Sequence, residues 1–258
     1  MSAVLYEVNN RIAYITLNRP EKRNALNYDM AEELTTAFLK AENDNTAKVV
    51  VLRANGEVFC AGADLEYLQE LQHYSEEDNI KDSIHLMQLF KTIYTLKKVV
   101  IAEVNGHAIA GGCGLVSICD FAFASGTANF GYSEVKIGFV PAIVMGFLIK
   151  KIGEARAKEM LLTGTFIKAK EAEKWHLITQ SVEDDNTLPE VVSQFAQKLC
   201  TSNSGTSMEL IKKMMSESQS LSLDDNMNYA AQINAFSRTT EDCKKGVAAF
   251  LNKQKLEW

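Results

Sequence analysis

The stretch "AGGCGLVSICD" (110–120) marks the point where a strand pattern changes into a helix pattern. The apolar run "KKVVIAEVNG" (97–106) before it is typical of a buried strand. The start of a helix carries free backbone N–H groups and the positive end of the helix dipole, so it can stabilise an anion. Gly114 lies just inside this helix, where glycine is less favourable than alanine by about 1 kcal/mol. The stretch therefore indicates an anion site made of backbone, and a glycine that helix formation does not explain.

Short strand and helix patterns alternate on both sides of this stretch, which indicates an α/β fold. Strands are predicted over 11–20, 47–56, 97–106, 120–125, 128–134 and 177–182, and helices over 28–43, 65–74 and 83–96. Residues 76–82, "EEDNIKD", are strongly charged and are expected to be exposed. From about residue 143 onward the patterns are mostly helical. We therefore expect a strand-and-helix core over residues 1–190 and a helical region over residues 191–258.

The composition argues against several classes of partner. The 258-residue chain has a net charge of −6, which does not favour binding to nucleic acid or to an anionic membrane. It has five cysteines but no CxxC pair, so free thiols in a reducing cytosol are expected. No signal peptide is apparent, no apolar run approaches the ~18 residues of a membrane span, and no histidine pattern suggests a metal site. These features predict a cytoplasmic protein that binds neither metal, membrane nor nucleic acid.

Two further stretches contain residues suited to catalysis. In "FCAGADLEYL" (59–68), small residues again precede a helix start, and Asp64 is a good N-cap residue. In "FGYSEVKIGFVP" (130–141), Glu134 has mostly apolar neighbours, which raise the pKa of a carboxyl group and suit it to general base catalysis. Two helix starts that converge on one oxygen would form an oxyanion hole. Taken singly, the glycines are equally explained by tight packing, and Glu134 by a solvent-facing position before a helix.

Together these stretches resemble the crotonase (enoyl-CoA hydratase/isomerase) superfamily. The resemblance also includes "ITLNRPEKRNALN" near the N-terminus and "GVAAFLNKQK" near the C-terminus, in the family's order and spacing. It implies a spiral of stacked ββα units that holds an acyl-CoA site, followed by a helical C-terminal region that forms trimers and covers the site. It further implies a coenzyme A thioester substrate, a homotrimer or hexamer, and no cofactor beyond the coenzyme A moiety.

The same resemblance assigns roles to individual residues. The backbone N–H groups of Ala63 and Gly111 would hold the thioester oxygen, and Glu134 would be the catalytic carboxylate. The residues expected to contact the substrate or its coenzyme A moiety are Arg23, Ala25, Ala61, Gly62, Asp64, Leu65, Pro141 and Lys253. Of these, Arg23 and Lys253 are candidate phosphate contacts, with Lys253 coming from a neighbouring subunit.

The chain departs from the hydratases of this family at Gly114. Hydratases have a second glutamate there, and hydration needs one group to activate water and one to deliver a proton. A single carboxylate suffices for isomerisation, because it can take a proton from C2 of a 3-enoyl thioester and return it at C4. We therefore expect an enoyl-CoA isomerase acting through Glu134.

Two alternatives remain open. One is an enoyl-CoA or methylglutaconyl-CoA hydratase with a relocated second acid. The helix predicted over 65–74 offers Glu66, Glu70 and His73 for this role, although a surface role is favoured for each. The other is a non-catalytic paralogue that binds acyl-CoA.

Overall fold

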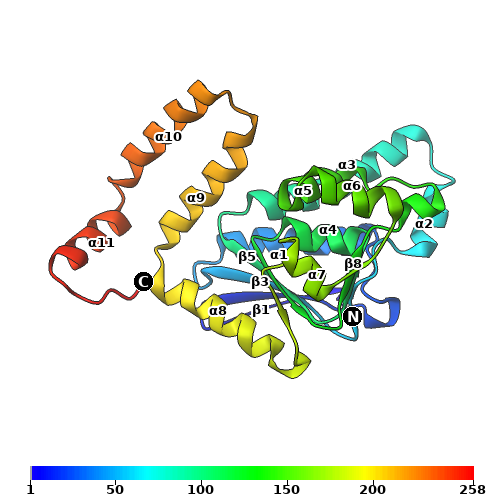
Figure 1. Ribbon diagram of the computed structural model, residues 1–258, viewed down its shortest axis with the longest axis horizontal. Coiled ribbons are helices and arrows are strands. Elements are labelled where there is room, and N and C mark those ends of the chain that lie inside the picture. Colours follow the sequence, from blue (N-terminus) through cyan, green and yellow to red (C-terminus); the bar gives the residue numbers. More distant parts are fainter. Residues whose placement is uncertain (1) are drawn as a thin grey trace.

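The computed structural model describes residues 2–258 and contains a six-stranded sheet with the order β1-β2-β3-β5-β7-β10 (Figure 1). Its strands are β1 (Val4–Asn9), β2 (Ile12–Leu17), β3 (Val49–Ala54), β5 (Val99–Val104), β7 (Phe121–Ser125) and β10 (Gln180–Val182). Only β1 and β2 pair antiparallel; the other neighbours are parallel. The continuous apolar runs of β3 and β5 are buried on both faces, as expected for central parallel strands.

A second sheet of four short strands lies beside the first, in the order β4-β6-β8-β9. Its strands are β4 (Val58–Cys60), β6 (His107–Ile109), β8 (Asn129–Gly131) and β9 (Ile167–Lys168). The pairs β3–β4, β5–β6 and β7–β8 each contribute one strand to each sheet, and the first two pairs are followed by helices α2 and α4. The chain therefore advances in repeated β-β-α turns, and successive helix starts lie next to one another.

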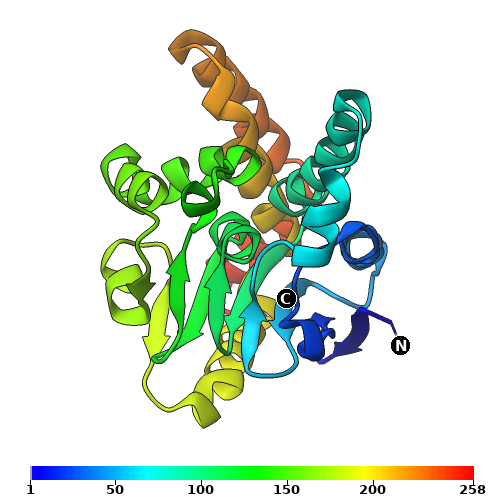
Figure 2. The same cartoon turned by 90° about the vertical axis from the view of Figure 1, so that its right-hand side faces the viewer.

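Helices cover both faces of the six-stranded sheet (Figure 2). The helices of the body are α1 (Tyr28–Asn43), α2 (Leu65–Leu71), α3 (Glu76–Thr95), α4 (Gly111–Ile118), α5 (Ala142–Ile152), α6 (Glu154–Thr163), α7 (Ala169–Lys174) and α8 (Leu188–Ser202). Alternate residues of one strand pack on opposite faces: Val50 belongs to the core that includes α1, whereas Val49 and Val51 pack in the cluster that includes α8.

The last three helices form an arm that projects from the body: α9 (Gly205–Glu217), α10 (Leu223–Ser237) and α11 (Glu241–Leu251) (Figure 1). Neither α9 nor α10 has a buried residue. Lys212 anchors the arm to the body, because its Nζ lies 2.6 Å from Asp120 Oδ2 and 2.8 Å from the Lys98 carbonyl oxygen. None of the helices described in residues 2–258 is both long enough and apolar enough to cross a membrane.

The α/β prediction is confirmed, and α1 spans the predicted residues 28–43. Several elements differ from expectation, among them the short strands β4, β6 and β9, which lie outside the predicted strands. The N-terminal strand β1 has no predicted counterpart, and residues 76–82 are the first turns of α3, whose start is capped when the Ser75 hydroxyl accepts from the Asp78 N–H at 3.1 Å. The predicted boundary between residues 190 and 191 falls inside α8, which packs on the sheet. Four cysteines are buried and all five are free.

Candidate active site

Two strand-to-helix turns meet at the edge of the small sheet, and glycines allow the approach. A Cβ atom on Gly112 would lie 2.3 Å from the Cys60 carbonyl oxygen, and one on Gly62 would lie 2.6 Å from Ala110 Cβ. Gly62 also has a φ of +94°, which L side chains rarely adopt. Each turn therefore needs a glycine where it touches the other, so the pairing of the turns is built into the sequence.

Both turns present an unpaired backbone N–H group. Within residues 2–258, neither the Ala63 N–H nor the Gly111 N–H donates a hydrogen bond. Leu26 forms a parallel β-bridge with Ala63: the Leu26 N–H donates to the Gly62 carbonyl oxygen, and the Asp64 N–H donates to the Leu26 carbonyl oxygen. The Ala63 N–H therefore points away from Leu26. Ala110, the residue before α4, has φ 53° and ψ −123°, which is a strained conformation for alanine. This conformation sets the orientation of the next peptide group, which carries the Gly111 N–H. The two N–H groups can serve as oxyanion donors.

Glu134 begins a short 3-10 helix (Glu134–Ile137) and is only 8% exposed. Its Oε2 is buried without a hydrogen-bond partner in the described residues 2–258. Burial raises the pKa of the Glu134 carboxyl group, and a hydrogen bond from its own backbone N–H offsets part of the rise. A carboxyl group in this state can act as a base near neutral pH.

One cavity of about 330 Å³, here called the central cavity, is lined by Ala63, Gly111 and Glu134 together. Pro141 also lies on its wall, as predicted for a substrate contact. Much of the remaining wall is apolar and includes Leu68, Leu71, Leu86, Phe139, Val140 and Ile143. The predicted oxyanion donors and the predicted base therefore face one apolar space.

The position of Gly114 is closed by neighbouring side chains. A Cβ atom there would lie 2.4 Å from Val144 Cγ1 and 3.1 Å from Phe90 Cε1. Both neighbours line the central cavity. The second carboxylate of a hydratase could not be placed at residue 114 without moving Val144.

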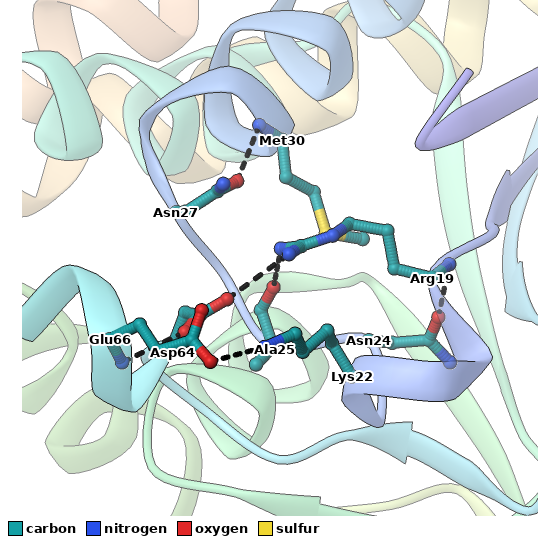
Figure 3. A network of polar contacts seen from close by, with 8 residues as sticks. All are labelled: Arg19, Lys22, Asn24, Ala25, Asn27, Met30, Asp64 and Glu66. Atoms are coloured by element: carbon teal, nitrogen blue, oxygen red, sulfur yellow. Dashed lines mark hydrogen bonds and ion pairs between the residues drawn. The ribbon is translucent and has the colours of Figure 1, made fainter. Parts of the chain in front are cut away.

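Asp64 and Ala25 belong to a network of polar contacts beside the two turns (Figure 3). Asp64 caps α2 by accepting from the Glu66 N–H at 3.0 Å, and its other oxygen lies 3.1 Å from Arg19 Nη2. Arg19 also donates to the Ala25 carbonyl oxygen at 3.0 Å. Asp64 and Ala25 thus fix the shape of the first turn, whether or not they also touch a ligand.

The other predicted contacts are distributed more widely. The Ala61 N–H donates to the Arg23 carbonyl oxygen at 3.1 Å, and Arg23 and Leu65 are both exposed near the same turn. Lys253 follows α11, which lies at the opposite side of the molecule from α2 (Figure 1). A role for Lys253 at the site therefore requires a second copy of the chain.

None of the three candidates for a relocated acid lines the central cavity. Glu66 is exposed and pairs with Lys22 at 2.6 Å, and Glu70 and His73 are also exposed. Their exposure agrees with the surface role favoured for them. No group of three His, Cys, Asp or Glu residues within residues 2–258 is arranged to hold a metal ion.

Six polar residues of the cavity wall are not among the predicted site residues: Asn27, Tyr28, Tyr67, Asp82, Ser83 and His85. The Tyr67 hydroxyl donates to Asp82 Oδ1, and the rings of Tyr28 and His85 stack with centroids 3.9 Å apart. Asp82 was overlooked because its segment was interpreted only as charged and exposed. The serine cap at residue 75 would have placed Asp82 at helical spacing with Leu86 and Phe90, on the inward face of α3.

Comparison with known proteins agrees with this architecture. The model of the family described as enoyl-CoA hydratase/isomerase matches residues 7–258. The Thermus thermophilus protein named "Putative enoyl-CoA hydratase" is 39% identical over 94% of this chain and 95% of its own length. The short-chain-enoyl-CoA hydratase of Clostridium acetobutylicum is 32% identical over 100% of this chain and 97% of its own.

The fold comparison gives the same answer. A crystal structure of an enoyl-CoA hydratase from Mycobacterium smegmatis matches with a TM-score of 0.91 and 29% identity, covering 99% of this chain and 98% of that one. The predicted crotonase fold is thereby confirmed. The chain belongs to the enoyl-CoA hydratase/isomerase family.

Proposed function

We propose that the protein moves a proton at C2 of an enoyl-CoA thioester, with Glu134 as the acid–base group. The support is that Glu134 shares one cavity with the free N–H groups of Ala63 and Gly111. Removing a proton from C2 places negative charge on the thioester oxygen, and fixed N–H donors stabilise that charge. The burial that raises the pKa of Glu134 suits it to accept this proton.

The reaction that a single carboxylate supports is double-bond isomerisation. Glu134 takes the C2 proton of a 3-enoyl thioester, and the electron pair of the C–H bond forms a dienolate whose oxygen accepts from Ala63 and Gly111. The protonated Glu134 then returns the proton to C4, which leaves a 2-enoyl thioester and restores the carboxylate. Isomerisation is favoured over hydration by the packing of Val144 and Phe90 at Gly114, because these side chains occupy the space that a second carboxylate at residue 114 would need.

Hydration of a 2-enoyl thioester is the second candidate. It is favoured by the names of the relatives, which include a short-chain-enoyl-CoA hydratase and a crotonyl-CoA hydratase. Hydration at this site would need a second acid–base group other than residue 114, because residue 114 is glycine.

Product analysis separates the two reactions. Purified protein is incubated with a 3-enoyl-CoA and, separately, with a 2-enoyl-CoA of the same length. Isomerisation gives a product of unchanged mass and new retention time, whereas hydration adds the mass of water. Faster hydration than isomerisation would replace the first candidate with the second. No conversion of either thioester, combined with tight binding of both, would leave only an acyl-CoA-binding role.

We also propose that the arm joins copies of the chain into a trimer or hexamer. Ile211, Met215, Leu223, Met227 and Phe236 are apolar side chains of the arm that are more than half exposed. A second copy would bury them, and it would supply the Lys253 that one chain does not bring to its own site. Light scattering of the eluted protein should give the mass of three or six chains, and a monomer at micromolar concentration would contradict this proposal.

A further inference from the structure

The central cavity is acidic, although the coenzyme A group of the proposed substrate is negatively charged. Two carboxyl groups, Glu134 and Asp82, line it, and no Lys or Arg side chain of residues 2–258 does. Glu134 has the chemical role proposed above, but that mechanism makes no use of Asp82. Asp82 is half-buried in a largely apolar wall, so its presence there needs an explanation of its own.

Asp82 is held in place by Tyr67. The Tyr67 hydroxyl of α2 donates to Asp82 Oδ1 of α3, and burial together with this hydrogen bond raises the pKa of Tyr67, so the phenol keeps its proton and remains the donor. Within residues 2–258, no lysine, arginine or histidine forms an ion pair with Asp82. Both ring nitrogens of His85 face other groups, with Nδ1 3.6 Å from Glu32 Oε2 and Nε2 3.3 Å from the Tyr28 carbonyl oxygen. The charge of Asp82 is therefore not compensated nearby.

Asp82 and Phe90 lie far apart along the cavity wall formed by α3. Phe90, which packs over Gly114, is eight residues further along α3, a distance of about 12 Å at the rise of an α-helix. The space between them is lined by Leu86. Since Val144 and Phe90 close the cavity beside Gly114, an acyl chain that starts at Ala63 and Gly111 has room to extend toward Asp82.

The space beyond Asp82 is also acidic. Tyr28, Tyr67 and Asp82 line both the central cavity and a second one of about 390 Å³, which Asp78 and Lys81 also line. Lys81 is already paired with Glu77 at 2.9 Å and with Asp78 at 3.3 Å. A substrate carboxylate entering here would have to compete with these two acids for the one lysine.

We propose that Asp82 is a specificity-determining residue that excludes acyl groups ending in a carboxylate, so that the substrates are enoyl-CoA thioesters with a neutral acyl group. This inference rests on the proposed function for the position of the thioester. Like charges in a partly buried site repel over several ångströms, and such repulsion separates ligands of similar size. A neutral chain meets only the apolar wall and the Tyr67–Asp82 pair.

Binding measurements test the proposal without depending on turnover. The probes are two saturated six-carbon CoA thioesters, one ending in methyl and one in carboxylate, with affinities measured by calorimetry for wild type and Asp82→Asn. Asparagine keeps the acceptor for Tyr67 and removes the charge. Wild type should bind the methyl-ended probe at least about tenfold more tightly, and Asp82→Asn should reduce that ratio by about tenfold. The wild-type ratio should also fall as salt is added.

Two further variants control for charge and for packing. Glu70→Gln makes the same charge change on an exposed residue of α2 that does not line the cavity, and it should leave the ratio unchanged. Tyr67→Phe removes the hydrogen bond but leaves the Asp82 charge, so the exclusion should persist. If Asp82→Asn fails to fold, the salt dependence of the wild-type ratio remains the test, and a ratio that salt does not change would contradict the proposal.

Several results would overturn the proposal. They are a wild type that prefers the carboxylate-ended probe, a ratio that Asp82→Asn does not change, and a loss of turnover of a neutral enoyl-CoA in Asp82→Asn as large as that in Glu134→Gln. The last result would make Asp82 a catalytic residue. Failure of the proposed function looks different, because wild type would then bind both probes with the expected ratio yet convert no enoyl-CoA.

Discussion

The two ends of the central cavity are built in different ways. The end that we propose to be catalytic is lined by Ala63, Gly111 and Glu134, and in our proposal two of these three residues act through the backbone. The acyl end consists of Tyr67, Asp82 and Leu86, which act through side chains from two helices. Backbone donors are fixed by turns that only glycine permits, whereas the acyl end can change by single side-chain substitutions without altering the fold. We therefore expect the catalytic end to define the type of chemistry and the acyl end to define the substrate.

The largest effect is expected at the catalytic end, from Glu134→Gln. The variant keeps the shape of the side chain but cannot accept a proton, so conversion of an enoyl-CoA should fall by about a thousandfold. Affinity for a saturated acyl-CoA should change little. Glu70→Gln is the matched control, and it should keep wild-type activity. Comparable rates in Glu134→Gln and wild type would remove this residue from the mechanism.

The next largest effect tests the backbone donors. In Gly112→Ala the new Cβ would lie 2.3 Å from the Cys60 carbonyl oxygen, so the two turns must separate and move the N–H groups. We expect activity to fall by about a hundredfold and the free energy of unfolding by about 1–3 kcal/mol. Gly146→Ala is the control, because its Cβ would meet nothing within 4 Å. Equal behaviour of the two variants would mean that the contact between the turns is unimportant.

A third prediction concerns the second carboxylate. Gly114→Glu should lower the free energy of unfolding by about 2 kcal/mol and should not increase hydration, because Val144 occupies the space. Combining it with Val144→Ala should restore stability and raise hydration of a 2-enoyl-CoA. A single variant that folds like wild type and hydrates faster would show that residue 114 has room for a carboxylate.

The smallest effect is on stability and depends on pH. The pKa of Glu134 is raised in the folded state, so its contribution to stability is fully present below the unfolded value of about 4.3 and is lost as pH rises through the folded value. At neutral pH, Glu134→Gln should therefore melt a few degrees higher than wild type, by about 2–4 °C. The difference in melting temperature should shrink toward pH 4. A lower melting temperature for Glu134→Gln at neutral pH would contradict the burial of a charged group.

More of the proposed catalytic end than of the acyl end could be predicted from the sequence. Runs of small residues before a helix indicate accessible N–H groups, and the resemblance to the crotonase superfamily then assigns Ala63 and Gly111 as the donors. The partner of Asp82 could not be named, because the hydrogen bond from Tyr67 depends on how α2 and α3 pack. Likewise, Gly114 suggested an absent carboxylate, but only the packing of α5 shows that Val144 takes its space.

In the proposed mechanism Glu134 alone moves the proton at C2, and isotope exchange at C2 measures this step. A saturated acyl-CoA is incubated with the protein in deuterated water, and deuterium at C2 is measured by mass spectrometry. Wild type should exchange this hydrogen at a rate that falls as pH drops through the raised pKa of Glu134, and Glu134→Gln should show no exchange above background. Exchange by Glu134→Gln at the wild-type rate would contradict this mechanism.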